Sequence, residues 1–123
     1  MHTILWIAQI ILALMFGMAG AMKATQPYDK VSEMMNWAKH VSPTQVRIIG
    51  VLELLAAVGL ILPALTGILP WLTPLAAIGL ILTMIGAATL HYRIGEGNAI
   101  IVNMVLLAVA LFIAYGRFVV APL

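Results

Sequence analysis

The chain has 123 residues, of which 64% are hydrophobic and only 8% are charged, and its formal net charge is +2. Ordinary soluble domains carry about 25% charged residues, so this composition excludes that class and is typical of a membrane protein. The six basic residues form no run that could neutralise phosphates in number, which excludes nucleic acid as a partner and favours contact with anionic lipid headgroups.

The first apolar segment, residues 3–24, is long enough to cross a bilayer, because about 20 helical residues span the hydrocarbon. Small residues recur in it at intervals of four, at Ala13, Gly17 and Ala21. Such stripes let membrane helices pack closely, so we expect this one to pack inside the bundle, with a homodimer face as the alternative. No Lys or Arg precedes the apolar core, which favours an uncleaved span over a signal peptide.

The first connection, "QPYDKVSEMMNWAKHVSP", is longer than a turn. Val31, Met34, Met35 and Ala38 repeat in it at helical spacing, which predicts a short amphipathic helix lying along the headgroups. We interpret it as a surface linker or, because Met-rich faces adapt to varied contacts, as a lid or a docking surface for a partner.

The second apolar segment, residues 44–66, carries a single carboxylate, Glu53, within "RIIGVLELLAAVGLILP". Ten residues after Pro43, Glu53 lies about 15 Å into the span, near the bilayer centre. An ionised side chain there costs at least about 3 kcal/mol, so Glu53 must face the bundle interior. Arg47 precedes it by six residues, which places the two side chains about 120° apart around the helix.

Residues 71–91 and 98–118 form the third and fourth apolar segments. None of the four shows the period-two alternation of a membrane β-barrel. The predicted fold is therefore all-α: an antiparallel four-helix bundle, in one domain covering residues 1–123, with the amphipathic helix in its first connection.

Basic residues gather around the first and third connections: Lys23, Lys30, Lys39, Arg47 and Arg93. The two termini and the second connection together have only Arg117. The positive-inside rule then predicts that the first and third connections are cytoplasmic and that both termini lie outside.

Partners for Glu53 must come from other helices. Lys23, His91 and Asn103 approach the half of the bundle that also holds Arg47, whereas the opposite half, apart from Gln9 and a few threonines, is nearly all apolar. Two interpretations of this predicted cluster stay open. It is either a structural ion pair or hydrogen-bond clamp, with the terminal basic residues reaching the headgroups and His91 at the interface, or a ligand or proton site.

The residue types limit the cofactors. The chain has no cysteine, which excludes thiol redox chemistry, thiolate iron–sulfur ligation and covalent c-type haem. Its three histidines are dispersed, without the spacing of a zinc site or a facing pair for b-type haem. We predict no metal site.

Several motifs resemble those of the DoxX-like family of small bacterial four-helix membrane proteins: "AGAMK", "RIIGVLELLAAVGLILP", "AATLHYR" and "AYGR". The resemblance covers nearly the whole chain and implies a multi-pass protein of the bacterial inner membrane. It also implies that Lys23, Gly50 with Glu53, and His91 are recurrent positions. We expect Gly50, like the small residues of the first segment, at a helix contact. Some members resemble partners of oxidoreductases or assembly helpers, one of them linked to quinone-coupled sulfur oxidation, so the family does not by itself indicate an enzyme.

Three hypotheses follow for the function. The first is a non-catalytic membrane subunit or scaffold of an oxidoreductase or respiratory-type complex. The second is a polar pocket around Glu53 that binds a quinone-like or other amphipathic molecule. The third is proton or solute transport, for which a four-helix bundle leaves little space.

Overall fold

A computed structural model describes all 123 residues, and the chain is helical almost throughout. Four helices are long and apolar enough to cross a membrane: α1 (His2–Thr25), α3 (Pro43–Thr66), α4 (Leu72–Arg93) and α5 (Gly97–Tyr115), which a π-helical turn, η2 (Gly116–Val120), prolongs. These are the four predicted spans, with ends shifted by a few residues. The prediction of an all-α four-helix membrane bundle is confirmed.

Local sequence explains where α3 begins and ends. The Ser42 hydroxyl accepts a hydrogen bond from the Gln45 amide, and the Gln45 side chain accepts one from the Ser42 amide. This capping box, followed by Pro43 at the first helical position, satisfies amide groups that have no partner within the helix. At the other end Gly67 takes a left-handed conformation (φ +73°) that stops the helix before the turn to α4.

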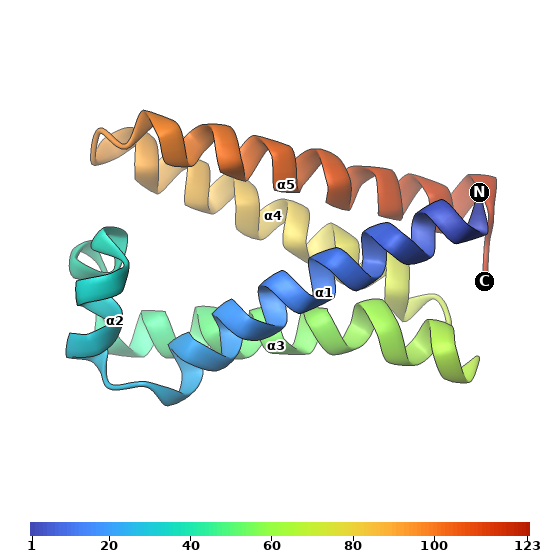
Figure 1. Ribbon diagram of the computed structural model, residues 1–123, viewed down its shortest axis with the longest axis horizontal. Coiled ribbons are helices and arrows are strands. Elements are labelled where there is room, and N and C mark those ends of the chain that lie inside the picture. The colour runs from blue at the N-terminus through green and yellow to red at the C-terminus, as the bar shows by residue number, and fades with distance from the viewer.

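The four long helices associate as two pairs. α1 packs mainly on α3, and α4 packs mainly on α5. Figure 1 shows α1 running diagonally, from beside α5 where the two chain termini lie to α3 where α2 lies. We call these the terminus end and the α2 end. Because α1 leaves the α4–α5 pair as it crosses, the two pairs are close together at the terminus end and separated at the α2 end.

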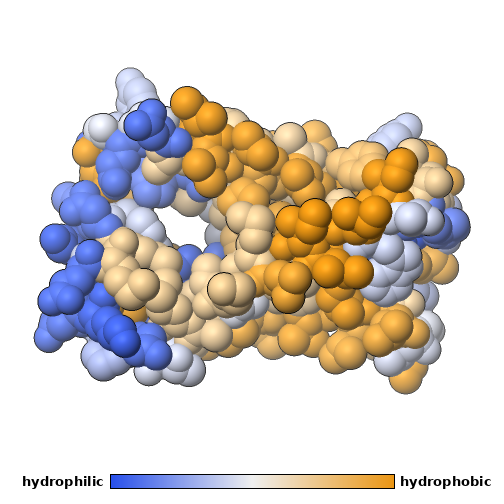
Figure 2. All heavy atoms as spheres, viewed as in Figure 1, coloured by the Kyte–Doolittle hydropathy of each residue, from blue (hydrophilic) through white to orange (hydrophobic).

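The apolar core lies between the pairs towards the terminus end. Its fully buried side chains include Leu12, Leu60, Leu80 and Ile113. Large apolar side chains are also exposed along the outside of all four long helices, and Figure 2 shows this apolar surface over the length of the bundle, with the polar residues at its ends. An exposed apolar belt of this kind is suited to hydrocarbon rather than water.

The first connection differs from the single amphipathic helix expected. It forms two short helices, α2 (Tyr28–Met34) and the 3₁₀ helix η1 (Asn36–His40), separated by Met35 in an extended conformation. The break changes the expected face: Val31 and Ala38 are buried, but Met34 is exposed. The Tyr28 hydroxyl lies 2.7 Å from the Ala38 carbonyl oxygen and 2.9 Å from that of Val41. These hydrogen bonds hold the start of α2 against the end of η1, an arrangement that one continuous helix could not form.

Candidate functional site

Glu53 faces the bundle interior and pairs with Lys23. The Lys23 ammonium donates to the Glu53 carboxylate at an Nζ–Oε1 distance of 2.5 Å, and the two side chains are only 9% and 3% exposed. A buried carboxylate is tolerated inside a membrane protein when an opposite charge is this close. The pair joins the last turn of α1 to the middle of α3.

Close contact between α1 and α3 makes this pairing possible. A Cβ atom added to Gly20 would lie 2.7 Å from the Gly50 carbonyl oxygen, and one added to Gly50 would lie 2.7 Å from the Ala24 amide nitrogen. Small residues at such a crossing let the two backbones meet. Gly50 therefore lies at a helix contact, but its counterpart is Gly20, which was not part of the predicted stripe. Of that stripe, Gly17 faces Ala57, Ala13 packs against the core, and Ala21 is half-buried.

Arg47 has a different role from the one considered for it. Its Nη1 donates to the carbonyl oxygen of Lys23 at 2.8 Å, so it caps the C-terminal end of α1. A cation is favourable at that position because the last carbonyls of a helix carry partial negative charge. Arg47 thus supports the backbone that carries Lys23 and does not line the cavity described next.

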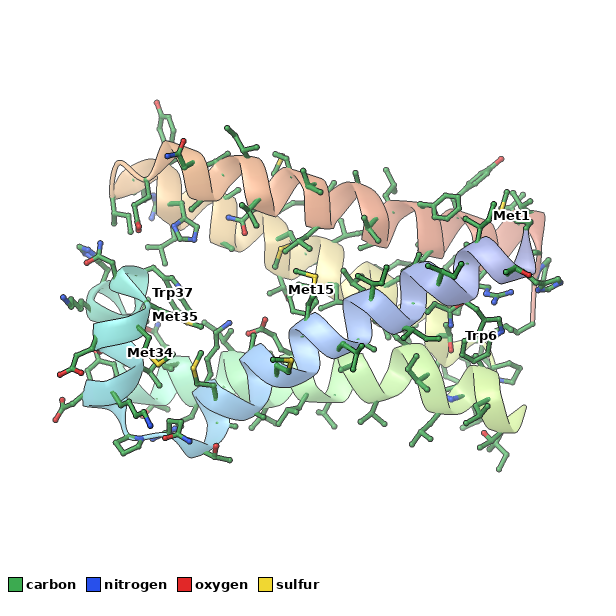
Figure 3. All side chains as sticks on the ribbon, in the orientation of Figure 1. Met1, Trp6, Met15, Met34, Met35 and Trp37 are labelled. Atoms are coloured by element: carbon green, nitrogen blue, oxygen red, sulfur yellow. The ribbon has the colours of Figure 1, made fainter.

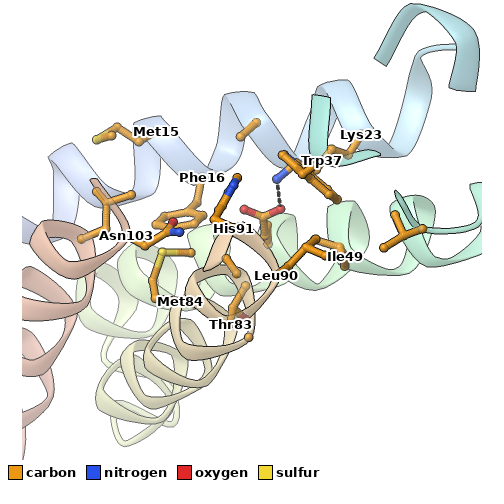
Figure 4. Close-up of a pocket in the computed structure, with 16 residues that line it drawn as sticks. Met15, Phe16, Lys23, Trp37, Ile49, Thr83, Met84, Leu90, His91 and Asn103 are labelled. Carbon is orange, nitrogen blue, oxygen red and sulfur yellow. Dashed lines mark hydrogen bonds and ion pairs between the residues drawn. The ribbon is translucent and has the colours of Figure 1, made fainter. Parts of the chain in front are cut away.

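A cavity of about 550 Å³ lies beside the ion pair at the α2 end, between the two helix pairs (Figure 4). Most of its wall is apolar, formed by Met15, Phe16, Ile49, Met84, Leu90 and Leu106. Its polar lining consists of Lys23, Glu53, Thr83, His91 and Asn103. Four of the five residues of the predicted cluster therefore meet around one cavity, to which α1, α3, α4 and α5 all contribute.

His91 and Asn103 present hydrogen-bonding groups to this cavity from the wall opposite the ion pair. The Nδ1 atom of His91 lies 3.3 Å from a carboxylate oxygen of Glu96, at the end of the bundle, while its Nε2 atom has no protein partner. Asn103 is only 7% exposed, and its amide nitrogen has no hydrogen-bond partner. Buried amide donors are nearly always paired, so this nitrogen marks a position where an acceptor is missing.

Trp37 also lines the cavity, although it is not one of the five residues of the predicted cluster. It belongs to η1, and its ring lies over the Lys23 ammonium at 5.1 Å from the ring centroid. Figure 3 shows Trp37 projecting from the first connection towards the space between the helix pairs. A cation over an indole face is favourable, so Trp37 both covers and stabilises the charged end of the cavity.

A second buried polar cluster lies at the terminus end and contradicts the expectation that this half is nearly all apolar. The Arg117 side chain is 2% exposed, and its Nε donates to Gln9 Oε1 at 2.7 Å. Its Nη1 lies 2.7 Å from His2 Nδ1 and donates to the Ala121 carbonyl at 3.0 Å, while Gln9 Nε2 donates to the Leu60 carbonyl at 2.7 Å. The expectation was wrong because Arg117 was counted only as a basic residue flanking the fourth span, whereas it lies buried in the π-helical turn η2 and bonds to Gln9.

The cavity has the composition of a site for a small amphipathic molecule. Ligand pockets of 300–1,000 Å³ are mostly apolar, with a few convergent polar groups that fix orientation. Here the apolar wall could hold a ring or chain, and Asn103 and His91 could bind an oxygen atom. We see no arrangement of a nucleophile with a general base around it.

Comparison with known proteins gives one match. The sequence model of the DoxX-like family matches residues 7–113, a range that contains every residue lining the cavity. No curated protein and no solved structure matches the chain.

Proposed function

The chain belongs to the DoxX-like family and is a multi-pass membrane protein, and from this starting point we propose that it binds a small amphipathic molecule in the cavity beside Glu53. The observation that carries the proposal is the unpaired Asn103 amide nitrogen in a cavity whose wall is mostly apolar. Leaving a buried donor unsatisfied costs about 1–3 kcal/mol, and a ligand oxygen would remove that cost.

A quinone-like head is one chemistry that suits this lining. Its carbonyl oxygens would accept from Asn103 and from the His91 ring, and its flat ring would contact the aromatic and thioether side chains of Phe16 and Met84. The isoprenoid or alkyl tail would lie against the apolar wall.

Binding can be measured through Trp37, because it lines the cavity. In the double variant Trp6→Phe/Trp71→Phe, Trp37 is the only tryptophan, and a decyl-substituted benzoquinone in detergent micelles should quench its fluorescence in a saturable manner. Asn103→Leu in this background should weaken binding about tenfold, the equivalent of 1.4 kcal/mol. Asn98→Leu is the matched control, because Asn98 is exposed at the start of the same helix and does not line the cavity.

Two results would count against the proposal. One is quenching that rises linearly with quinone and never saturates, which is the behaviour of collisions in the micelle. The other is equal binding by the Asn103→Leu and Asn98→Leu variants, which would remove the role of the unpaired amide.

The subunit hypothesis, in which the chain supports an oxidoreductase or respiratory-type complex in a bacterial inner membrane, stays a prediction. Purification from native membranes in mild detergent, followed by identification of proteins that accompany the chain, tests it directly. We do not propose transport, because the apolar core around Leu12, Leu60 and Ile113 lies between the cavity and the terminus end.

A further inference from the structure

The cavity reaches the outside of the bundle in the gap between the α1–α3 pair and the α4–α5 pair. Two of its lining residues are also exposed on the molecular surface: Met15, which is 45% exposed, and Gly86. Figure 3 shows Met15 on the side of α1 that borders the gap between the two helix pairs. A Cβ atom added to Gly86 would meet nothing within 4 Å, so the space in front of this glycine is open.

This mouth lies at the depth of the hydrocarbon. Met15 is ten residues before the end of α1, which corresponds to about 15 Å along the helix, and Gly86 is seven residues before the end of α4, or about 10 Å. Figure 2, which views the molecule across its helices, shows a hollow between α1 and the α4–α5 pair. A molecule dissolved among lipid chains would therefore meet the mouth directly.

The end of the cavity nearer the headgroups is covered. Trp37 of η1 and Val41 of the first connection line it there, and the Trp37 ring lies over Lys23. The first connection is held over this end by the Tyr28 hydroxyl and by the buried Val31, Ala38 and Val46. The cavity is therefore open from the side of the bundle, whereas its aqueous end is covered by the first connection.

The charges in the cavity favour an uncharged ligand head. Lys23 and Glu53 neutralise each other at 2.5 Å, and the remaining polar lining consists of His91, Asn103 and Thr83. An additional buried charge would have no partner here and would be costly. The unpaired amide nitrogen of Asn103 instead favours an oxygen acceptor, a carbonyl or a hydroxyl.

We propose that the cavity takes its ligand sideways from the lipid, through a portal in the gap between the two helix pairs whose rim includes Met15 and Gly86, and that the ligand is a bilayer-dissolved amphiphile with an uncharged, oxygen-bearing head. This inference rests on the proposed binding function and adds the route and the chemical class. The portal and the head-binding groups are separate, so each can be altered alone.

Gly86→Leu tests the portal, and Gly79→Leu is its matched control. Gly79 lies two turns earlier on α4, is also exposed with nothing near an added Cβ, and does not line the cavity. Both variants replace a helical glycine by the same residue, so they gain the same helix propensity. The experiment follows Trp37 quenching by stopped flow, after mixing nanodiscs that contain the protein with vesicles that contain the decyl benzoquinone.

We expect Gly86→Leu to slow association by about tenfold and Gly79→Leu to behave as the wild type. A side chain that blocks the route slows association, whereas the loss of a contact with the bound ligand speeds dissociation. An unchanged association rate in Gly86→Leu would overturn the portal while leaving binding intact. An absence of saturable binding in the wild type would instead overturn the proposed function itself.

Competition at equilibrium tests the ligand class. Dodecanol, dodecanoate and dodecyltrimethylammonium have the same chain length and differ in head charge. Dodecanol should displace the benzoquinone at a concentration at least about tenfold lower than either charged compound. Stronger displacement by dodecanoate or by the ammonium compound would overturn the assignment of an uncharged head.

Discussion

Two buried cations lie at opposite ends of this bundle and are stabilised in different ways. Lys23 at the α2 end has a carboxylate partner and a cavity beside it, whereas Arg117 at the terminus end has only neutral partners and is enclosed by packed side chains. The first joins α1 to α3 and leaves space in front of the pair. The second, through Gln9 and the Leu60 carbonyl, connects α1, α3 and η2 in one chain of hydrogen bonds.

The comparison shows that buried polar groups in this membrane protein either join helices or face a cavity. At the terminus end, nearly every hydrogen-bonding group is used to hold helices together, and only Arg117 Nη2 is unpaired. At the α2 end, the Gly20–Gly50 contact and the ion pair hold α1 to α3, whereas Asn103 and His91 make no hydrogen bond that joins the two helix pairs. The side chains of Asn103 and His91 are therefore available to bind a ligand.

The largest expected effect comes from breaking the ion pair. Lys23→Met leaves Glu53 buried without its counter-charge and should lower the free energy of unfolding by about 3–5 kcal/mol. Unfolding in mixed micelles, followed by circular dichroism, measures this. Lys30→Met, at an exposed position of α2, should change stability by no more than about 0.5 kcal/mol.

The double variant Lys23→Met/Glu53→Leu should recover most of that loss, because an apolar pair of similar volume is often as stable as a buried ion pair. A loss below about 1 kcal/mol in Lys23→Met would mean that water in the cavity hydrates the remaining carboxylate. The α2 end would then resemble a surface site more than a buried one.

A smaller effect, with a specific order, is expected at the terminus end. Gln9→Leu removes one acceptor of a buried guanidinium and should cost about 3 kcal/mol, whereas Arg117→Met leaves only neutral groups unpaired, on Gln9, His2 and Ala121, and should cost about 1 kcal/mol. The same unfolding measurement ranks them. The reverse order would show that Arg117 contributes mainly by packing, for instance against the Trp6 ring that its guanidinium faces at 5.9 Å.

Glycine substitutions compare the helix contacts at the two ends. A Cβ at Gly20 would meet backbone atoms of α3, which cannot move independently, so Gly20→Ala should cost about 2 kcal/mol. A Cβ at Gly116 would meet only the end of the Leu5 side chain, which can change rotamer, so Gly116→Ala should change stability by no more than about 1 kcal/mol. Equal losses at both sites would show that Leu5 is as rigid as the backbone.

The fold could be predicted from the sequence because hydrocarbon imposes a simple rule on it. Every residue of a span must be apolar or paired inside, so spans, their ends and the inward direction of Glu53 follow from composition and length. Lys23, His91 and Asn103 could be placed in the same half for the same reason, since each lies near the same end of its span.

Features that depend on helix rotation and winding could not be predicted. The contact at Gly20 instead of Ala21 differs by one residue, or about 100° around α1, which a stripe of small residues in an apolar span does not specify. Arg117 was placed by a π-helical turn that no residue pattern announced. Trp37 and Lys23 meet across different elements, so no spacing in the sequence relates them.

The order of the paired helices has a consequence for biosynthesis. Both members of the ion pair lie within the first 53 residues, on α1 and α3, and the α4–α5 hairpin follows them. Chains are synthesised from the N-terminus. Glu53 can therefore enter the membrane with Lys23 already available as its partner, before the α4–α5 hairpin has been synthesised. Glu53 is the residue whose insertion into the membrane costs most. Its insertion then requires only α1 and α3, and not the later helices α4 and α5.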